Sequence, residues 1–262
     1  MSFLSRLGRF DVVTSTNDVV AGWLAEGTPE VALAIADRQT AGRGREQRTW
    51  IAPPGAALLL SLGFRPPGMP LADGWRLAAL LALATAEAAE SVSGLPDGTI
   101  GLKWPNDLVA EAPDGSLRKI AGVLGESTAE GDLVAGAVVG VGLNCDWPAA
   151  DFPTPLAESM TSLREVSRRR VDREAILVEL LEALDRRYRA LRRGDFDAGS
   201  WIARQRTTGR RLTVETGSRT IEGRGAGVDP ESGALLVETD DGTQAIGSGE
   251  VVSCRLVEPA AV

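Results

Sequence analysis

Short apolar runs separated by polar turns recur through the first 145 residues of the chain. Apolar side chains fill residues 31–37 and 56–64 almost without interruption, which is typical of strands buried in a sheet. The first strand is predicted to end near Val13. Three more strands are predicted over residues 100–109, 118–127 and 132–144.

Three other segments carry the spacing of a helix. The polar turn from Thr14 to Asn17 can cap a helix, because apolar side chains follow it at Val19, Val20, Trp23 and Leu24. An Ala/Leu-rich helix is predicted from Trp75, and another from about Asp172 to Arg192 with apolar residues three and four apart. These elements predict an α+β fold, in which a mixed or antiparallel sheet has helices on one face.

The pattern changes after Trp201. Four or five short strands, each ended by a turn, follow within roughly 50 residues. This arrangement is typical of a small β-barrel of the SH3-like type. The sequence therefore predicts a first domain over residues 1–206 and a C-terminal barrel over residues 207–262.

Composition excludes several kinds of chemistry. The 262 residues include no histidine, so a Ser/His/Asp triad and a His-ligated zinc are ruled out. A net charge of −8 argues against binding nucleic acid, since that affinity comes mainly from Lys and Arg. No apolar run approaches the roughly 18 residues of a membrane span. Cys145 and Cys254 stand far apart, as expected of reduced thiols in the cytoplasm.

The segment "QTAGRGREQRTW", residues 39–50, is cationic and rich in glycine. Gly42 and Gly44 allow the backbone to approach a ligand closely, while the guanidinium groups of the three arginines suit a phosphate or a carboxylate. These arginines are Arg43, Arg45 and Arg48. A surface hairpin with solubilising charges is the alternative interpretation.

The segment "KWPND", residues 103–107, is a second candidate. Pro105 cannot donate to a sheet ladder, so it ends the strand and leaves Asn106 and Asp107 at the lip of the sheet. A polar pair at that place can contact a ligand or a metal ion. A simple turn built from Pro, Asn and Asp is the alternative.

Lys119 opens the following strand, and a hairpin of this length returns it toward Asp107. The two residues can form an ordinary ion pair, or the lysine can bind an anionic substrate. Gly122 follows in the same strand, and "GVGLN", residues 140–144, has glycines that clear space above the sheet before the polar Asn144.

Together these segments resemble the biotin protein ligases, also called biotin–[acetyl-CoA carboxylase] ligases. The resemblance rests on "TSTND" (14–18), "QTAGRGREQRTW", "KWPNDL" (103–108), "RKIAGVLGE" (118–126) and "VGVGLN" (139–144), in the order of the family. It implies a catalytic domain like that of class II aminoacyl-tRNA synthetases, followed by the barrel. It also implies that biotin and ATP react, with Mg²⁺, to give biotinyl-5′-AMP, from which biotin passes to a lysine of a biotin carboxyl carrier protein.

The resemblance implies a role for each matching residue. Lys119, Arg45 and Asp107 would be catalytic, with Asp107 acting either as a general base or as a metal ligand. Biotin would be bound by Ser15, Thr16, Asn17, Gln39, Gly42, Arg43, Gly122, Gly140 and Gly142. The nucleotide would be bound by Arg45, Arg48, Trp50, Asn106, Lys119, Asn144 and Arg255.

The chain departs from the family pattern at two places. Glu46 and Gln47 stand where many members have arginine and glycine, which predicts a stiffer and less cationic loop. The first motif begins near residue 14, so we expect a monofunctional ligase without the DNA-binding domain of the bifunctional members, and a monomer. The alternatives are a lipoate or octanoate ligase of the same fold and a ligand-binding adaptor without enzyme activity.

Overall fold

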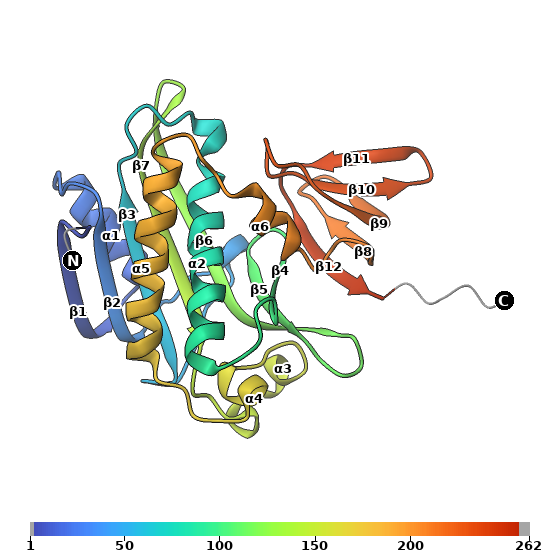
Figure 1. Cartoon of the computed structure of the whole chain (residues 1–262), viewed down its shortest axis with the longest axis horizontal. Coiled ribbons are helices and arrows are strands. Elements are labelled where there is room, and N and C mark those ends of the chain that lie inside the picture. Colours follow the sequence, from blue (N-terminus) through green and yellow to red (C-terminus); the bar gives the residue numbers. More distant parts are fainter. Residues whose placement is uncertain (1–2, 257–262) are drawn as a thin grey trace.

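A seven-stranded sheet forms the centre of the first domain in the computed structural model, which describes residues 3–256 (Figure 1). The strand order is β1-β2-β3-β7-β6-β5-β4. β1 and β2 are parallel and every other neighbouring pair is antiparallel, which confirms the predicted mixed sheet. The strands are β1 (Arg6–Val13), β2 (Ala32–Gln39), β3 (Ala57–Phe64), β4 (Ile100–Lys103), β5 (Asp107–Glu111), β6 (Leu117–Glu130) and β7 (Leu133–Asn144).

Two long helices cover one face of this sheet. They are α2 (Trp75–Ser93) and α5 (Arg173–Leu191), and they lie side by side (Figure 1). The side chain of Asp172 caps α5 by accepting from the backbone N–H groups of Glu174 and Ala175, while α2 ends at Gly94 in a left-handed conformation. Both helices therefore begin or end where the sequence provides a suitable capping residue.

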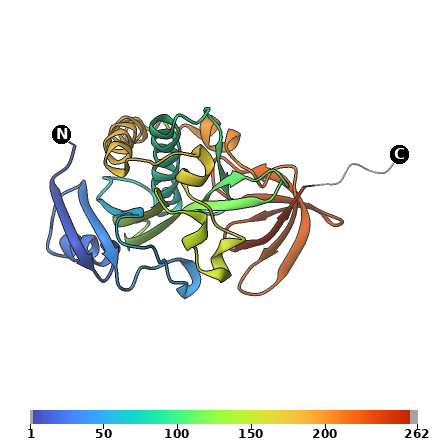
Figure 2. The ribbon, with the colours of Figure 1, turned by 90° about the horizontal axis from the view of Figure 1, so that it is seen from below.

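Helix α1 (Thr16–Ala25) lies on the opposite face, so the prediction of helices on one face describes only α2 and α5 (Figure 2). The reason is the alternation of side chains along β2. Leu33 and Ile35 belong to the main core, whereas Ala32 and Ala34 pack with Trp23 of α1 in a second, smaller cluster. Small alanines on that side leave room for a short helix.

The predicted strand over residues 100–109 is wrong as a single element. Residues 100–103 and 107–111 form two antiparallel strands, β4 and β5, with Lys103 opposite Asp107 in the register. The chain turns over Trp104 to Asn106, where Pro105 has no N–H for a ladder. This tight hairpin places Lys103, Asn106 and Asp107 together at one end of the sheet.

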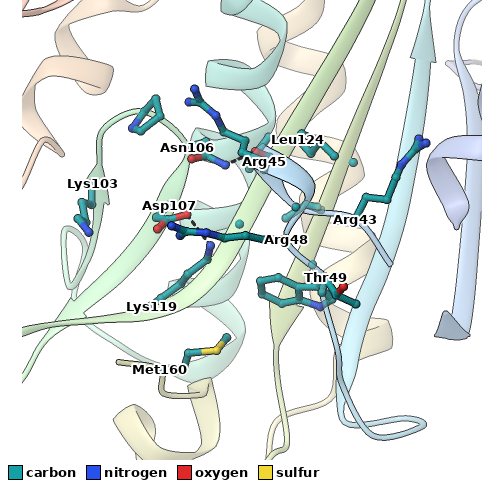
Figure 3. A pocket seen from close by; sticks show the side chains of 18 of the residues that line it. Arg43, Arg45, Arg48, Thr49, Lys103, Asn106, Asp107, Lys119, Leu124 and Met160 are labelled. Carbon is teal, nitrogen blue, oxygen red and sulfur yellow. Dashed lines mark hydrogen bonds and ion pairs between the residues drawn. The ribbon is translucent and has the colours of Figure 1, made fainter. Parts of the chain in front are cut away.

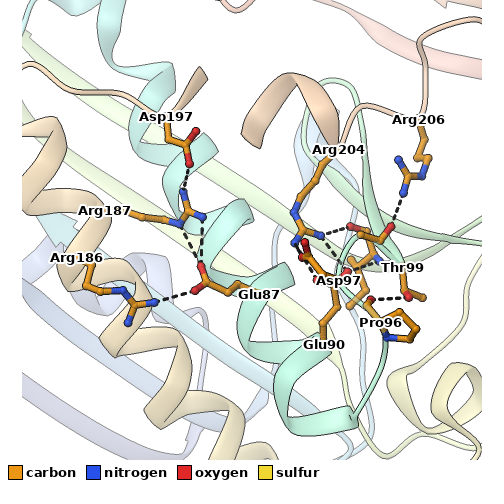
Figure 4. A network of polar contacts seen from close by, with 12 residues as sticks. Glu87, Glu90, Pro96, Asp97, Thr99, Arg186, Arg187, Asp197, Arg204 and Arg206 are labelled. Carbon is orange, nitrogen blue, oxygen red and sulfur yellow. Dashed lines mark hydrogen bonds and ion pairs between the residues drawn. The ribbon is translucent and has the colours of Figure 1, made fainter. Parts of the chain in front are cut away.

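Ion pairs connect the end of α2 to later parts of the chain (Figure 4). Glu87 pairs with Arg186 of α5 at 2.8 Å. Glu90, which is buried, accepts from Arg204 at 2.9 Å and from the backbone N–H of Ile100 at 2.7 Å. Because Ile100 begins β4, this buried carboxylate fixes the start of the strand that leads into the 103–107 turn. The shorter helices are α3 (Thr154–Ala157), α4 (Leu163–Ser167) and α6 (Ala198–Ala203).

Five antiparallel strands in the order β11-β10-β9-β8-β12 form the C-terminal domain, as the pattern predicted. They are β8 (Arg211–Glu215), β9 (Thr220–Val228), β10 (Leu235–Thr239), β11 (Gly242–Ile246) and β12 (Glu250–Arg255). The proposed boundary at residues 206 and 207 falls between α6 and β8, and residues 257–262 of the second domain lie outside the described residues. In the described part, no helix is long and apolar enough to cross a membrane.

The barrel is fastened to the first domain by polar contacts. Arg210, only 5% exposed, pairs with Glu111 at 2.6 Å and donates to the carbonyl of Gly115 at 2.7 Å. The indole N–H of Trp104 donates to the carbonyl of Gly233 at 3.0 Å. The barrel therefore contacts both the 103–107 turn and the β5–β6 hairpin, and its last strand reaches the same end of the sheet.

Candidate active site

A cavity of about 500 Å³ lies on the α1 face of the sheet (Figure 3). It is bounded by the start of α1, residues 43–51, the 103–107 turn and the beginning of β12. Lys103 and Lys119, the two lysines of the whole sequence, both line it. A chain that otherwise uses arginine side chains for positive charge thus places both of its lysine ammonium groups around one cavity.

Glycines form the floor of the cavity because a larger side chain would collide there. A Cβ on Gly140 would overlap Oδ1 of Asn17, and one on Gly142 would lie 2.5 Å from the ring of Trp50. A Cβ on Gly122 would lie 3.0 Å from Nζ of Lys119. Each of the three glycines therefore lies directly beneath a side chain that lines the cavity.

The inner end of the cavity is lined by buried, uncharged polar residues. Ser15, Thr16 and Asn17 are each less than 5% exposed at the start of α1. Gln39, at the end of β2, accepts from the backbone N–H of Thr16 at 2.8 Å. Ser61 of β3 is fully buried between Thr16 and Asn17, a position that no pattern in the sequence indicated. These groups suit a neutral ligand with hydrogen-bond donors and acceptors.

The outer end carries the charged groups. Nζ of Lys119 lies 2.6 Å from Oδ1 of Asp107, so the expected return of the hairpin is present. The same ammonium group lies 5.5 Å from the centre of the Trp50 ring, within reach of a cation–π contact. Asn106 donates to the carbonyl of Val123 at 2.8 Å, which orients its amide beside the pair. Lys119 can exchange Asp107 for an anionic ligand without leaving the cavity.

The arginine loop is folded over the mouth of the cavity in this structure. Its two arms are joined by backbone hydrogen bonds from Gly44 to Arg48 at 2.6 Å and from Trp50 to Gly42 at 2.9 Å. Arg43 pairs with Asp18 at 2.9 Å and with Glu126 at 3.0 Å, and Arg48 pairs with Glu250 of the barrel. The loop is therefore held by carboxylates from α1, β6 and β12, none of which the sequence analysis identified.

The tip of the loop is strained. Glu46 and Gln47 have φ angles of 51° and 61°, the left-handed region that costs a residue with a Cβ about 1 kcal/mol or more. Glycine adopts this conformation without that cost. The departure from the family pattern at Gln47, where many members have glycine, thus raises the free energy of the folded loop, whereas Glu46 stands in place of an arginine with the same cost.

Some predicted site residues do not line this cavity. Asn144 is fully buried and donates to the carbonyl of Thr161 at 3.0 Å, while its Oδ1 has no hydrogen-bond partner among the described residues. Arg255 is exposed on β12, opposite Arg211 of β8. Gly42 is buried beside the cavity, against Trp50. The remaining predicted residues are brought together around it.

The sequence model of the biotin/lipoate A/B protein ligase family matches residues 9–144, and that of the biotin protein ligase C-terminal domain matches residues 207–252. Together they cover the sheet with its cavity and most of the barrel.

Curated relatives extend the match to most of the chain. The biotin–[acetyl-CoA-carboxylase] ligase of Mycobacterium tuberculosis is 32% identical, over 94% of this chain and 90% of the relative. The ligase of the same name from Paracoccus denitrificans is 33% identical, over 91% and 97%. The bifunctional ligase/repressor BirA of Bacillus spizizenii is 32% identical over 92% of this chain and 72% of its own length.

A solved structure agrees with these relatives. The biotin protein ligase from Aquifex aeolicus in complex with biotin and ATP is 27% identical and superposes with a TM-score of 0.76, over 98% of this chain and the whole of that one. Sequence, fold and both domains therefore give one answer: this chain belongs to the biotin protein ligases.

Proposed function

We propose that this chain activates biotin with ATP to form biotinyl-5′-AMP and then transfers the biotinyl group to a lysine of a biotin carboxyl carrier domain. The observation that supports this most is that one cavity has a neutral hydrogen-bonding inner end and a cationic outer end. The ureido ring of biotin suits the first, and the carboxylate and the phosphates suit the second. Relatives named as acetyl-CoA-carboxylase ligases indicate the acceptor.

The first step joins two anions, the biotin carboxylate and the α-phosphate of ATP. Its barrier is largely electrostatic, and preorganised cations lower it. Lys119 is the best-placed cation, because it stands at the floor of the cavity between the inner end and the mouth. Arg45 and Arg48 line the same mouth and would face the nucleotide, with Trp50 as a wall. Oxygen of the carboxylate attacks phosphorus, and pyrophosphate leaves.

The second step needs a neutral amine from the acceptor lysine, whose pKa in water is about 10.4. When Lys119 turns toward the adenylate, the carboxylate of Asp107 becomes available to take the proton of that amine. The amine nitrogen then attacks the acyl carbon, an amide bond forms, and AMP leaves with the electron pair of the broken anhydride bond. Asp107 is thus proposed as the general base.

Mg²⁺ would accompany ATP and neutralise part of the phosphate charge. Among residues 3–256 there is no group of three or more His, Cys, Asp or Glu residues that could hold a metal ion. Among the described residues that line the cavity, the carboxylates are those of Asp107 and Glu250, and both already pair with cations. Asp107 is the carboxylate of the described cavity floor that would reach the ion in the first step, before it serves as the base of the second step. Phosphate oxygens and water would supply the other ligands.

The wider setting of the enzyme is also part of the proposal. A net charge of −8 disfavours binding to nucleic acid, and both cysteines are free, as in a reducing cytoplasm. We expect a monomer with the carrier domain as its protein partner.

Biotin-dependent exchange of labelled pyrophosphate into ATP, measured beside biotin transfer to a purified carrier domain, tests the function. We expect both activities in the wild type and a fall of about 10²–10³-fold in both for Lys119→Ala, because a cation that acts on developing charge is removed. Lys119→Arg is the matched control, because arginine keeps the positive charge but replaces the compact ammonium group with a planar guanidinium. Exchange supported by lipoate but not by biotin would contradict the proposal.

A further inference from the structure

Six side chains form a continuous series of polar contacts around the inner end of the cavity. In the order of their contacts they are Gln39, Thr16, Ser61, Asn17, Glu126 and Arg43. Gln39 ends β2, and Arg43 lies four residues later in the arginine loop. The members between them in the series lie on α1, β3 and β6, so the first and last members of the series are close in the sequence. Four of its members were predicted from the sequence as biotin contacts; Ser61 and Glu126 were not.

The direction of each hydrogen bond in this series follows from counting protons. Nδ2 of Asn17 donates to Oε2 of Glu126 at 2.7 Å, so Oδ1 of Asn17 faces Ser61 and accepts its only hydroxyl proton at 2.5 Å. Thr16 must then supply the proton for its own contact with Ser61 at 2.7 Å. Its oxygen then has no second proton for Gln39, so the 3.1 Å approach of Thr16 Oγ1 to Oε1 of Gln39 is a contact without a shared proton in this arrangement. Oε1 of Gln39 accepts instead from the backbone N–H of Thr16 at 2.8 Å.

Glu126 determines this direction, because an ionised carboxylate only accepts hydrogen bonds. If the amide of Asn17 were reversed, its oxygen would face that carboxylate, and its NH₂ would face Ser61. The hydroxyl proton of Ser61 would then turn toward Thr16, and that of Thr16 toward Gln39. One charge therefore sets the orientation of three neutral groups in a row.

We infer that Glu126 is a specificity-determining positioning residue, which makes Thr16 an acceptor toward the cavity and ties that state to the closed loop through Arg43. With its proton committed to Ser61, Thr16 Oγ1 has a lone pair for a ligand N–H. Gln39, with Oε1 engaged, has its NH₂ for a ligand C=O. An N–H beside a C=O is the edge of a cyclic urea, so the inference rests on the proposed function and deepens it.

The contact with Arg43 gives the same carboxylate a second effect. Oε2 of Glu126 accepts from Arg43 at 3.0 Å as well as from Asn17. A ligand that holds Thr16 and Asn17 in this orientation therefore also favours the position of Glu126 that binds the loop. Binding at the inner end and closure of the mouth are coupled by one side chain, which does not itself line the cavity.

Pyrophosphate exchange in Glu126→Gln, Glu126→Asp and Glu130→Gln tests the inference. We expect Glu126→Gln to raise KM for biotin and for desthiobiotin equally, by about tenfold, with the thermal midpoint unchanged, because a charge-assisted hydrogen bond is lost at the urea end. Glu126→Asp, which keeps the carboxylate, should recover much of the loss. Glu130→Gln changes an exposed carboxylate of the same strand and should behave as the wild type.

A double variant distinguishes an effect of hydrogen-bond direction between positions 17 and 126 from an effect of side-chain packing. Asn17→Asp places two carboxylates together and should weaken biotin binding more than Glu126→Gln does. In Asn17→Asp/Glu126→Gln the amide at position 126 can donate to the carboxylate at position 17, which still accepts from Ser61, so KM for biotin should fall again relative to Asn17→Asp.

No recovery in the double variant, or an unchanged KM for biotin in Glu126→Gln, would overturn the inference while leaving the proposed function intact. Wild-type protein without biotin-dependent exchange would remove the proposed function and the inference together.

Discussion

The two faces of the central sheet differ in the size of the side chains that the same strands present to them. On β7, Val139 and Leu143 face the main core with α2, whereas Gly140 and Gly142 face the cavity. Neighbouring residues of a strand point to opposite faces of the sheet. The alternation of large apolar residues with glycines along β7 therefore gives a packed face toward α2 and a hollow face toward α1.

The hollow face is held in a different way from the packed one. Its inner end depends on buried hydrogen bonds such as that between Ser61 and Asn17, and its mouth on exposed ion pairs such as that between Arg43 and Asp18. Apolar burial supplies most of the folding free energy of a domain, while exposed pairs contribute little. Stability should therefore come mainly from the α2 face and ligand binding from the α1 face.

The largest effect on activity is expected where a Cβ is added to the hollow face. Gly140→Ala places a methyl group over Oδ1 of Asn17 and 3.0 Å from Oγ of Ser61, so the inner end must shift. We expect kcat/KM for biotin to fall about 100-fold, because small displacements of binding groups are costly. Pyrophosphate exchange measures this.

Gly125→Ala is the control on the α2 side of the sheet, at an exposed position of β6. There the nearest atom to a new Cβ is Cβ of Ala78 at 3.6 Å, an ordinary contact. The free energy of unfolding should stay within about 0.5 kcal/mol of the wild-type value. The kcat/KM for biotin should be close to that of the wild type. A comparable loss of activity in both variants would show that glycines of these strands matter for flexibility rather than for space on one face.

The next largest effect is on stability. Leu143→Ala removes a fully buried side chain from the core on the α2 face. We expect the free energy of unfolding to fall by about 2–5 kcal/mol, from lost apolar burial and a new cavity. KM for biotin and for ATP should be unchanged well below the new thermal midpoint. Denaturant unfolding and exchange kinetics on the same sample check both parts, and a raised KM in fully folded protein would contradict the division between the faces.

The sequence predicted the packed face better than the hollow one for a physical reason. Apolar spacing in 31–37, 56–64 and 172–192 directly reflects burial, so β2, β3 and α5 appear close to where they were expected. The glycines, Lys119 and Asp107 were also found, since turns and strand ends are set by nearby residues.

Ser61 and Glu126 could not be found in this way. Each is defined by its partners across the sheet, and the register that places Ser61 opposite Gly140 joins residues 79 apart in the sequence. Asn144 and Arg255 were assigned from the family pattern, and in the structure their side chains lie outside the cavity for local reasons: Asn144 is held by Thr161, and Arg255 lies beyond the part of β12 that reaches the loop. The spacing of residues in the sequence indicates neither the hydrogen bond of Asn144 nor the position of Arg255.

The smallest effect is expected at the rim of the hollow face. Asp18→Asn breaks the ion pair between Asp18 and Arg43 and leaves the contact of Arg43 with Glu126 in place. The side chain of Arg43 is 43% exposed and that of Asp18 is 46% exposed. The free energy of unfolding should change by less than about 1 kcal/mol, since solvent screens such a pair. Glu174→Gln, which breaks a similarly exposed pair with Arg9 away from the cavity, is the matched control. Denaturant unfolding of both variants at low and high salt measures the difference. If Asp18→Asn alone lost more than about 2 kcal/mol, ion pairs at the mouth would support the fold itself, and the hollow face would contribute to stability as the packed face does.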